Sequence, residues 1–360
     1  MLKRRVEEEN LTPLLDRMKN HSEEIEEAIK GRGGIQDRRS AIKFDSVVST
    51  GSTLLDLVVS GKRIRGGGLP GGIIVEVFGK SGTGKTAILE EIGASVQSRG
   101  GEIEYIDPEG RLDTEYAELY NLDITEKNYS RPDTVTELFA MFRKHNFKNE
   151  KVINAWLTDS LAALSTNMEM EGEDKRGQRR AKEFSEGLRK TCRLIAHNNQ
   201  LVVCSNQVRE GEHGEYSPGG LAIPFYSSLR IKISPVWQKG LSTKISKKVE
   251  INGKAMEKVI GIRSTCESVK SSLDDPFRKC NISILFGYGI DDIRDNLQYI
   301  KDINGYSTYE AIDKNFKGME QAIAHIEKNG YRSDLRERVI DLWEEVESKF
   351  ELNRERKERI

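Results

Sequence analysis

The chain has 360 residues, of which 32% are charged and 36% are hydrophobic. This length predicts roughly two to three domains, with a core large enough to fold without disulfide or metal staples. Lys and Arg together number 57 and Asp and Glu 58, so the overall charge does not predict a polyanionic partner, and a nucleic-acid site would need local clusters of basic residues. No apolar run reaches the ~18 residues of a membrane span. The polar start of the chain is unlike a secretory signal, so we expect a cytoplasmic protein without a membrane partner.

Residues 1–34 are predicted to form a helical arm and a linker. Apolar residues recur there at partly helical spacing among Glu and Lys, and Gly31, Gly33 and Gly34 end the pattern. Pro13 favours a break or a helix start. The segment is either a solvated helix or an arm that packs on a neighbouring subunit, and we assign it to oligomerisation.

Residues 35–290 are predicted to form an α/β core with a mostly parallel central sheet. Helical spacing at 87–98 and 135–147 lies between apolar runs that are typical of strands, and this alternation implies crossover connections. These runs lie at 73–78, 103–106, 152–157, 201–205, 229–233 and 281–286.

The later part of the chain has three segments of different character. Residues 211–220 contain few apolar side chains and are predicted to be a loop, whereas 238–254 are polar and are typical of an exposed hairpin or an insertion. Residues 291–360 return to a helical pattern and predict a small C-terminal helical lobe with a basic end.

The most specific motif is Gly79-Lys80-Ser81-Gly82-Thr83-Gly84-Lys85-Thr86, which fits G-x-x-x-x-G-K-[ST] between a predicted strand and a predicted helix. Its glycines let backbone N–H groups surround a phosphate, and the helix N-terminus adds positive potential. Lys85 is expected to contact the β- and γ-phosphates, and the Thr86 hydroxyl to ligate Mg²⁺. The motif therefore predicts a phosphate-binding loop for ATP and Mg²⁺.

Polar residues follow three of the predicted strands. Asp159 ends one run, where a carboxylate would lie beside the phosphates and hold the Mg²⁺ shell, unless it is an ordinary surface residue. Glu109 follows the strand at 103–106 and is expected to polarise the attacking water, with Asp107 as the rival. Gln207 ends a third strand and is expected to sense the γ-phosphate, although a lone strand-end Gln is usually structural.

Together these motifs, in this order, resemble those of the RecA family of bacterial and phage recombinases. The resemblance runs from about residue 44 to residue 289. Beside the phosphate-binding loop it rests on Ser49-Thr50-Gly51-Ser52 with Leu55-Asp56, Gly68-Leu69-Pro70, Asp107-Pro108-Glu109-Gly110, Asp159-Ser160-Leu161-Ala162, Asn206-Gln207-Val208-Arg209, Gly219-Gly220 with Phe225-Tyr226, Pro276-Phe277, and Phe286-Gly287-Tyr288-Gly289. It implies a RecA-type P-loop ATPase core and a DNA-dependent ATPase. Such an enzyme forms helical filaments on single-stranded DNA and promotes homologous pairing and strand exchange with duplex DNA.

Roles for individual residues are also implied by the resemblance. Glu109 matches the family's catalytic glutamate, and Gln207 its γ-phosphate sensor. Asp113 and Tyr116 fall where the family contacts the adenine, and Phe286 occupies another aromatic position near the base.

The family reaches the ATP of the neighbouring subunit with two lysines. Lys270 matches one of them, and Ser272 stands at the position of the other. The trans-acting chemistry is therefore expected to rest on Lys270 alone or to involve a nearby basic residue such as Arg278.

Two loops, near 165–178 and 208–220, are expected to bind DNA. Basic residues cluster after the first loop, and such a cluster can neutralise phosphates, although a charge run is more often a solvated helical face. Met168 and Met170 are either wedges between bases or core residues, and Tyr216 of the second loop is suited to stacking on a base. The residues expected to contact DNA are Arg176, Arg179, Arg180, Lys182, Arg189, Arg209, Gly219 and Gly220.

Other functions compete with a recombinase filament. The main alternative is a related DNA-dependent P-loop ATPase, either a ring-forming motor or a regulatory ATPase, that does not exchange strands. A small-molecule kinase would need a lid and an acceptor pocket, and the sequence indicates neither. Ser272 keeps open a nucleotide-gated binding module with little turnover.

Overall fold

A computed structural model describes residues 42, 44–144, 147–170, 178–211, 214–216, 220–236, 241–352 and 354. The predicted helical arm over 1–34 lies outside the described residues. Parts of the two predicted DNA-binding loops, including Arg176 and Gly219, also lie outside them.

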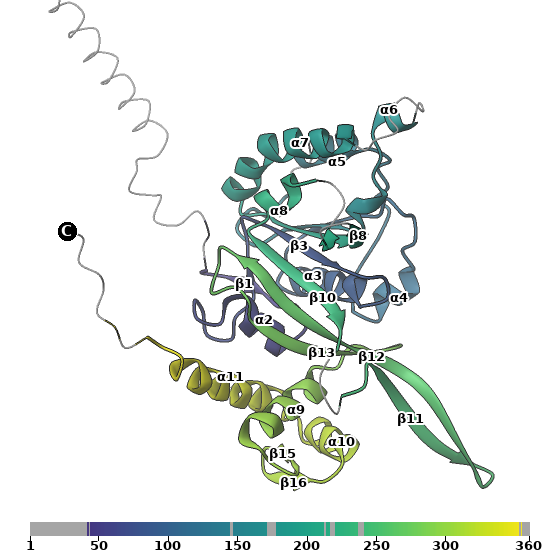
Figure 1. Cartoon of the computed structure of the whole chain (residues 1–360), viewed down its shortest axis with the longest axis vertical. Coiled ribbons are helices and arrows are strands. Elements are labelled where there is room, and N and C mark those ends of the chain that lie inside the picture. Colours follow the sequence, from purple (N-terminus) through teal and green to yellow (C-terminus); the bar gives the residue numbers. More distant parts are fainter. Residues whose placement is uncertain are drawn as a thin grey trace, which may run out of the picture. The chain divides into compact units, whose positions relative to one another are not determined.

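A ten-stranded sheet forms the centre of the described chain (Figure 1). Its order is β14-β13-β12-β10-β3-β7-β6-β4-β5, and β11 pairs with β12. Neighbouring strands from β10 to β5 are parallel, whereas β11, β12, β13 and β14 join in antiparallel pairs. The strands are β3 (Ile73–Gly79), β4 (Ile103–Ile106), β5 (Tyr129–Ser130), β6 (Ala155–Thr158), β7 (Leu201–Gln207), β10 (Leu229–Pro235), β11 (Lys244–Ile251), β12 (Lys254–Ser271), β13 (Lys279–Leu285) and β14 (Gly289–Ile290). The predicted mostly parallel α/β core is confirmed.

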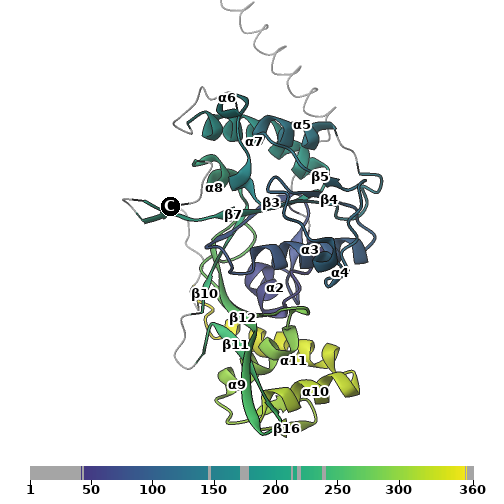
Figure 2. The same cartoon turned by 90° about the vertical axis from the view of Figure 1, so that its right-hand side faces the viewer.

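Helices cover both faces of this sheet (Figure 2). Alternate side chains of β3 point to opposite faces of the sheet. Val75 packs in one apolar cluster with Ile88 of α3, whereas Ile74 packs in another with Phe139 of α5 and Phe184 of α7. The helices of this part are α2 (Thr53–Ser60), α3 (Lys85–Ser98), α4 (Thr114–Glu118), α5 (Val135–Lys144), α6 (Asn167–Met170), α7 (Gln178–His197) and α8 (Ala222–Tyr226), with a 3-10 turn at Leu161–Ala163. None of the described helices is long and apolar enough to cross a bilayer.

Short strand pairs complete this part of the chain. The strands β1 (Val47–Val48) and β2 (Leu69–Pro70) pair before the phosphate-binding loop. The prediction of a loop over 211–220 was wrong in part, because β9 (Gly214–Tyr216) pairs with β8 (Arg209–Gly211). These strands of three residues have no alternation of apolar and polar side chains, so the sequence pattern does not indicate them.

The polar segment near 238–254 contains the first strand and the turn of an exposed hairpin, as one of its two interpretations predicts, and the second strand begins at its last residue, Lys254. The strands β11 and β12 pair on either side of a turn at Asn252 and Gly253, whose φ angles are 51° and 74°. Two successive left-handed residues are typical of a tight hairpin turn, and Asn-Gly is the sequence that adopts it most readily.

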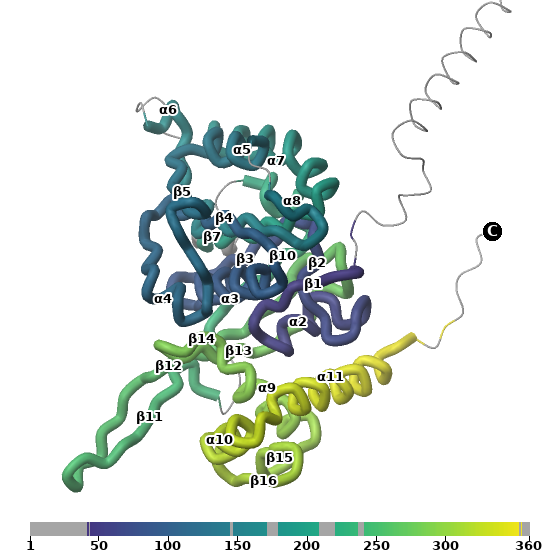
Figure 3. Tube along the Cα trace, turned by 180° about the vertical axis from the view of Figure 1, so that it is seen from behind, coloured from purple at the N-terminus to yellow at the C-terminus, as the bar shows by residue number. Residues whose placement is uncertain are grey.

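The C-terminal lobe consists of α9 (Asp292–Asn304), α10 (Met319–Asn329) and α11 (Arg332–Ser348) together with a small hairpin of β15 (Tyr309–Ala311) and β16 (Lys314–Phe316) (Figure 3). The helical pattern did not reveal this hairpin. Leu54 and Leu57 of α2 share an apolar cluster with Leu297, Val339 and Trp343 of the lobe, which therefore packs directly on the core.

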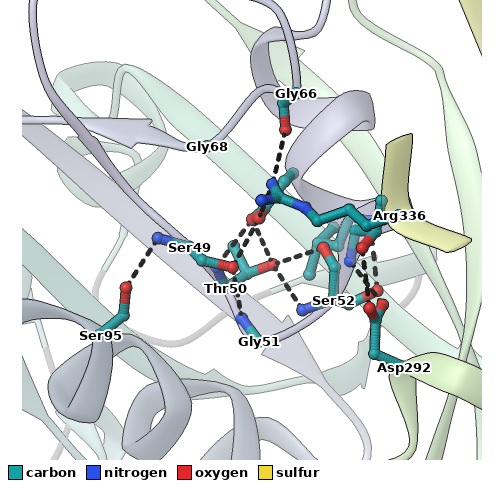
Figure 4. A network of polar contacts seen from close by, with 12 residues as sticks. Ser49, Thr50, Gly51, Ser52, Gly66, Gly68, Ser95, Asp292 and Arg336 are labelled. Carbon is teal, nitrogen blue, oxygen red and sulfur yellow. Dashed lines mark hydrogen bonds and ion pairs between the residues drawn. The ribbon is translucent and has the colours of Figure 1, made fainter. Parts of the chain in front are cut away.

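A polar network at the start of α2 also joins the core to the lobe (Figure 4). The buried Asp56 carboxylate accepts hydrogen bonds from the Ser49 hydroxyl (2.6 Å) and from the backbone N–H (2.7 Å) and hydroxyl (2.8 Å) of Thr50. Arg336 of α11 lies 3.6 Å from the same carboxylate, and Asp292 of α9 accepts the Thr53 N–H at 2.6 Å. Burial raises the pKa of Asp56 to about 6, against the opposing effect of these partners.

Candidate active site

The phosphate-binding loop connects β3 to α3, so its backbone N–H groups gather at a helix N-terminus. Gly84 is the residue before α3 and has a φ of 95°. A Cβ there would lie 2.1 Å from Cδ1 of Ile284, and only glycine combines this conformation with this close approach. The Thr83 hydroxyl donates to the Lys80 carbonyl (2.9 Å) and holds the loop closed.

Lys85, the first residue of α3, directs its ammonium group back over this loop. Its Nζ donates to the carbonyls of Gly79 (3.1 Å) and Lys80 (2.8 Å). Burial lowers the pKa of Lys85, while the carboxylates of Asp159 and Glu109 oppose the shift. Because these carbonyl partners are neutral, the ammonium can exchange them for charged phosphate oxygens, which form stronger hydrogen bonds.

Thr86 and Asp159 meet beside the loop. The Thr86 hydroxyl donates to Oδ2 of Asp159 at 2.6 Å, and the Ser205 hydroxyl donates to Oδ1. This pair of hard oxygen donors fits Mg²⁺, which takes one or two protein oxygens and completes its shell with phosphates and water. Within the described residues no group of three His, Cys, Asp or Glu could hold a metal ion by itself.

Glu109 and its rival Asp107 have different surroundings. The Glu109 carboxylate accepts the Ser160 hydroxyl at 2.8 Å and lies 3.1 Å from Arg111. Both oxygens of Asp107 are occupied by the turn itself, since they accept the N–H groups of Gly110 and Leu112 at 2.8 Å and the Tyr129 hydroxyl at 2.9 Å. Asp107 therefore anchors the segment that carries Glu109.

The third strand-end residue, Gln207, is exposed at the end of β7 next to a buried polar network. Its backbone N–H bonds the side-chain oxygen of Asn206 (3.0 Å), and the Asn206 amide donates to Glu76 (3.0 Å). Arg230 of β10 donates to the other oxygen of Glu76 at 2.6 Å. This Glu76–Arg230 pair could not be predicted from the sequence, because the two residues are separated by 154 positions and lie in otherwise apolar runs.

The residues expected near the adenine base lie on α4, at its N-terminal cap and in the turn after β13. Asp113 caps α4 by accepting the N–H of Glu115 (3.0 Å), and the Tyr116 hydroxyl accepts that of Tyr120 at 2.8 Å. Phe286 is 59% exposed in the turn after β13 and is therefore available for stacking.

Most of the predicted site residues line one cleft of about 380 Å³, whereas Gly79, Lys80 and Thr83 of the phosphate-binding loop are not among its lining residues. The structure thus brings together predicted residues that lie up to 205 positions apart in the sequence. The predicted residues that line the cleft are Ser81, Gly82, Gly84, Lys85, Thr86, Glu109, Asp113, Tyr116, Asp159, Gln207 and Phe286.

One wall of the cleft contains a residue that the sequence did not single out. Glu90 is fully buried in α3, one turn after Thr86, and neither carboxylate oxygen has a hydrogen-bond partner among the described residues. Burial raises the pKa of Glu90 to about 8, and Asp159, Glu91 and Asp113 add to the effect. Its i+4 spacing from Thr86 is the one signal that could have placed it near the site.

Lys270 does not line this cleft. Its ammonium group donates to the carbonyls of Pro224 (2.7 Å) and Phe225 (2.8 Å) in α8, and burial lowers its pKa. Its role at a neighbouring subunit's nucleotide stays a prediction.

The described part of the basic cluster lies on α7. Arg179 pairs with Glu183 at 3.2 Å, and Arg180 donates to the carbonyls of Ala162 and Leu164 at 3.3 Å, so both also have structural partners. Lys182 and Arg189 are exposed, as is Gly220 before α8. Met170 is 62% exposed and is therefore not a core residue, while its role as a wedge stays a prediction. Arg209 lies in β8, and its side chain is not among the described groups.

A parallel sheet whose P-loop, Thr–Asp pair and strand-end Glu and Gln meet in one cleft defines a P-loop ATPase of the RecA type. Comparison with known proteins gives the particular family. The model of the RecA N-terminal domain matches residues 18–291. The RecA protein of Ruminococcus albus is 31% identical over 281 residues, which span 76% of this chain but 65% of that protein, just under two thirds. The RecA protein of Thermus aquaticus is 31% identical over 296 residues (77% of this chain and 79% of the relative), and that of Staphylococcus aureus strain JH9 is 32% identical over 252 residues (68% and 67%). The chain belongs to the RecA family of recombinases.

Proposed function

We propose that this chain is an ATP-dependent recombinase that forms helical filaments on single-stranded DNA. It pairs this strand with homologous duplex DNA, promotes strand exchange, and hydrolyses ATP faster when DNA is bound. The observation that carries the proposal is the convergence of Lys85, Thr86, Asp159, Glu109 and Gln207 on one cleft in a member of the RecA family. Family membership argues against the alternative of a ring-forming or regulatory ATPase.

In this proposal the loop amides and Lys85 bind the β- and γ-phosphates. Thr86 and Asp159 hold Mg²⁺, which supplies positive charge to the phosphate oxygens when it is bound. Ser205 fixes the Asp159 carboxylate from its other side, so that one oxygen remains directed toward Thr86.

Glu109 accepts a proton from the attacking water. Ser160 donates to one of its oxygens and leaves the other beside the exposed Arg111, so that the carboxylate is oriented without being neutralised by a buried partner. The Gln207 amide bonds the γ-phosphate, and Asp113, Tyr116 and Phe286 receive the base. All five residues line the cleft.

Between subunits, Lys270 reaches the neighbour's nucleotide. DNA lies against the loops near 165–178 and 208–220 and the exposed basic face of α7. The 1–34 arm contributes to the filament contact.

The decisive experiment measures ATP hydrolysis with and without single-stranded DNA for the wild type, Glu109→Gln and Lys85→Ala. We expect DNA to stimulate the wild type several-fold. Glu109→Gln should retain nucleotide binding but lose about 10²- to 10⁴-fold in rate, the range typical of a general base. Lys85→Ala should lose binding as well. Glu118→Gln, an exposed carboxyl on α4 outside the cleft, is the matched control and should hydrolyse ATP normally.

Two results would overturn the proposal. Normal ATP hydrolysis by Glu109→Gln would refute the catalytic role of Glu109. A wild type whose hydrolysis rate does not change with single-stranded DNA would refute the proposed recombinase function. Electron microscopy with DNA and a slowly hydrolysed ATP analogue separates the architectures, since we expect open helical filaments and the ring-forming alternative requires closed rings.

A further inference from the structure

The β11–β12 hairpin continues well past the sheet from which it emerges (Figures 1 and 3). The inner part of β12 pairs with β13 over 261–267 and with β10 over 264–271. The outer part of β12, 254–259, pairs with β11 alone within the described chain. This outer part is a two-stranded ribbon with both faces open, an arrangement that is only marginally stable by itself.

Charge is distributed unequally between the two faces of this ribbon. Residues directly opposite each other in an antiparallel pair share a face, and every second residue along a strand returns to it. One face therefore holds the pairs Lys247–Lys258, Val249–Met256 and Ile251–Lys254. We call these six residues the cationic face. It carries three lysines and no carboxylate.

The opposite face carries charges of both signs, with one lysine and two glutamates. It holds the pair of Lys248 with Glu257, whose charged groups lie 3.6 Å apart, and the pair of Glu250 with Ala255. The two faces of the hairpin thus differ in charge, although both are exposed to solvent.

The cationic face is costly without a partner. Lys247 and Lys258 stand directly opposite each other, and like charges in that position destabilise a strand pair. Val249, Ile251 and Met256 are 43%, 51% and 57% exposed between the lysines. Lysines also prevent exposed strands from pairing with other chains, but that purpose is served by charge on either face and does not explain its segregation.

We propose that the cationic face binds duplex DNA, at a site separate from the two loops near 165–178 and 208–220. Paired lysines can neutralise neighbouring phosphates, and the apolar side chains between them can contact sugars and base edges. A two-stranded ribbon also has the dimensions that the major groove admits. The inference rests on the proposed DNA-dependent function, and it adds a contact for the second, double-stranded substrate.

The test compares duplex affinity across salt concentrations for the full-length wild type, Lys247→Gln, Lys247→Gln/Lys258→Gln and the control Lys248→Gln. Lys247 and Lys248 are adjacent in β11 but lie on opposite faces, so their variants remove the same charge from the same strand. Fluorescence anisotropy of a labelled duplex supplies the affinities, with a slowly hydrolysed ATP analogue present.

We expect each lost phosphate contact to reduce the slope of log affinity against log salt by about 0.9, which corresponds to roughly eightfold in affinity at 0.1 M salt. The double variant should lose about twice as much, and Lys248→Gln should match the wild type. The substitution to Gln also removes the Lys247–Lys258 repulsion, so the hairpin itself should not be weakened, and thermal unfolding checks this.

A double variant with the wild-type slope, or a Lys248→Gln variant that loses as much as Lys247→Gln, would overturn the inference. So would a wild type that does not bind duplex DNA. The proposed function is judged separately, by the stimulation of ATP hydrolysis by single-stranded DNA, which the double variant should retain.

Discussion

The buried Glu90 carboxyl gives the sharpest prediction about stability. Glu90 has no exposed surface and no hydrogen-bond partner within the described chain, and its pKa rises from 4.5 to about 8. Because the unfolded chain ionises this group first, folding becomes less favourable as the pH increases from about 4.5 to about 8. The full cost is roughly 5 kcal/mol at about 1.4 kcal/mol per pH unit, and about 3 kcal/mol has accumulated at pH 7.

Glu90→Gln removes the ionisation and keeps the shape of the side chain. We expect the free energy of unfolding of this variant, relative to the wild type, to increase by about 1.4 kcal/mol per pH unit between pH 5 and pH 8, as measured by urea denaturation. Glu90→Leu is the companion variant. Its packing differs, so its curve should be offset by a constant amount, but its pH dependence should match that of Glu90→Gln. Wild-type and variant curves that run parallel across this pH range would refute the reasoning.

Three further predictions concern the groups around the cleft. Arg230→Leu leaves the buried Glu76 carboxylate without its cation and should cost about 3–5 kcal/mol in chemical denaturation, part of which Glu76→Gln in the same chain should restore; no recovery would contradict this. Asp107→Asn replaces one of the carboxylate oxygens that anchor the segment carrying Glu109. It should lower the free energy of unfolding by about 1–3 kcal/mol and also lower the rate of ATP hydrolysis. An unchanged rate would show that this anchor does not contribute to catalysis. Thr86→Val removes the hydroxyl that we propose as a Mg²⁺ ligand and nearly keeps the side-chain volume, so half-maximal hydrolysis should need more Mg²⁺ in a titration; an unshifted titration would exclude Thr86 as a ligand.

Motif order and strand ends were sufficient to predict much of the cleft. Lys85 and Thr86 belong to a contiguous motif, and a parallel sheet brings the carboxyl ends of its strands to one edge. Asp159, Glu109 and Gln207 each follow a strand and therefore meet there, although their assigned chemical roles await the kinetic tests above.

The groups that support these residues could not be predicted, and the physical reason is the same for each. Ser160 and Ser205 are ordinary small residues until the fold places their hydroxyls beside Glu109 and Asp159. Whether Glu90 faces solvent or core depends on what covers α3, and the helical pattern alone does not contain that information. The short hairpins β8–β9 and β15–β16 also escape prediction, because strands of three residues are too short to show a hydrophobic period.

The polar chain behind Gln207 offers a physical route from the cleft to the second predicted DNA loop. Asn206 holds the Gln207 backbone and bonds Glu76, and Glu76 holds Arg230 on β10. Arg230 lies opposite Lys270 in the pairing of β10 with β12, and Lys270 bonds two carbonyls of α8, the helix that follows that loop. The links from Gln207 to Arg230 are hydrogen bonds and an ion pair in a buried sheet, and Arg230 and Lys270 are cross-strand neighbours of like charge, so a displacement of Gln207 changes the surroundings of each group in turn. Arg230→Leu cuts this chain at its centre without touching the cleft. It should therefore reduce the stimulation of hydrolysis by DNA more than it reduces hydrolysis without DNA, and equal losses in the two rates would show that the network only stabilises the sheet.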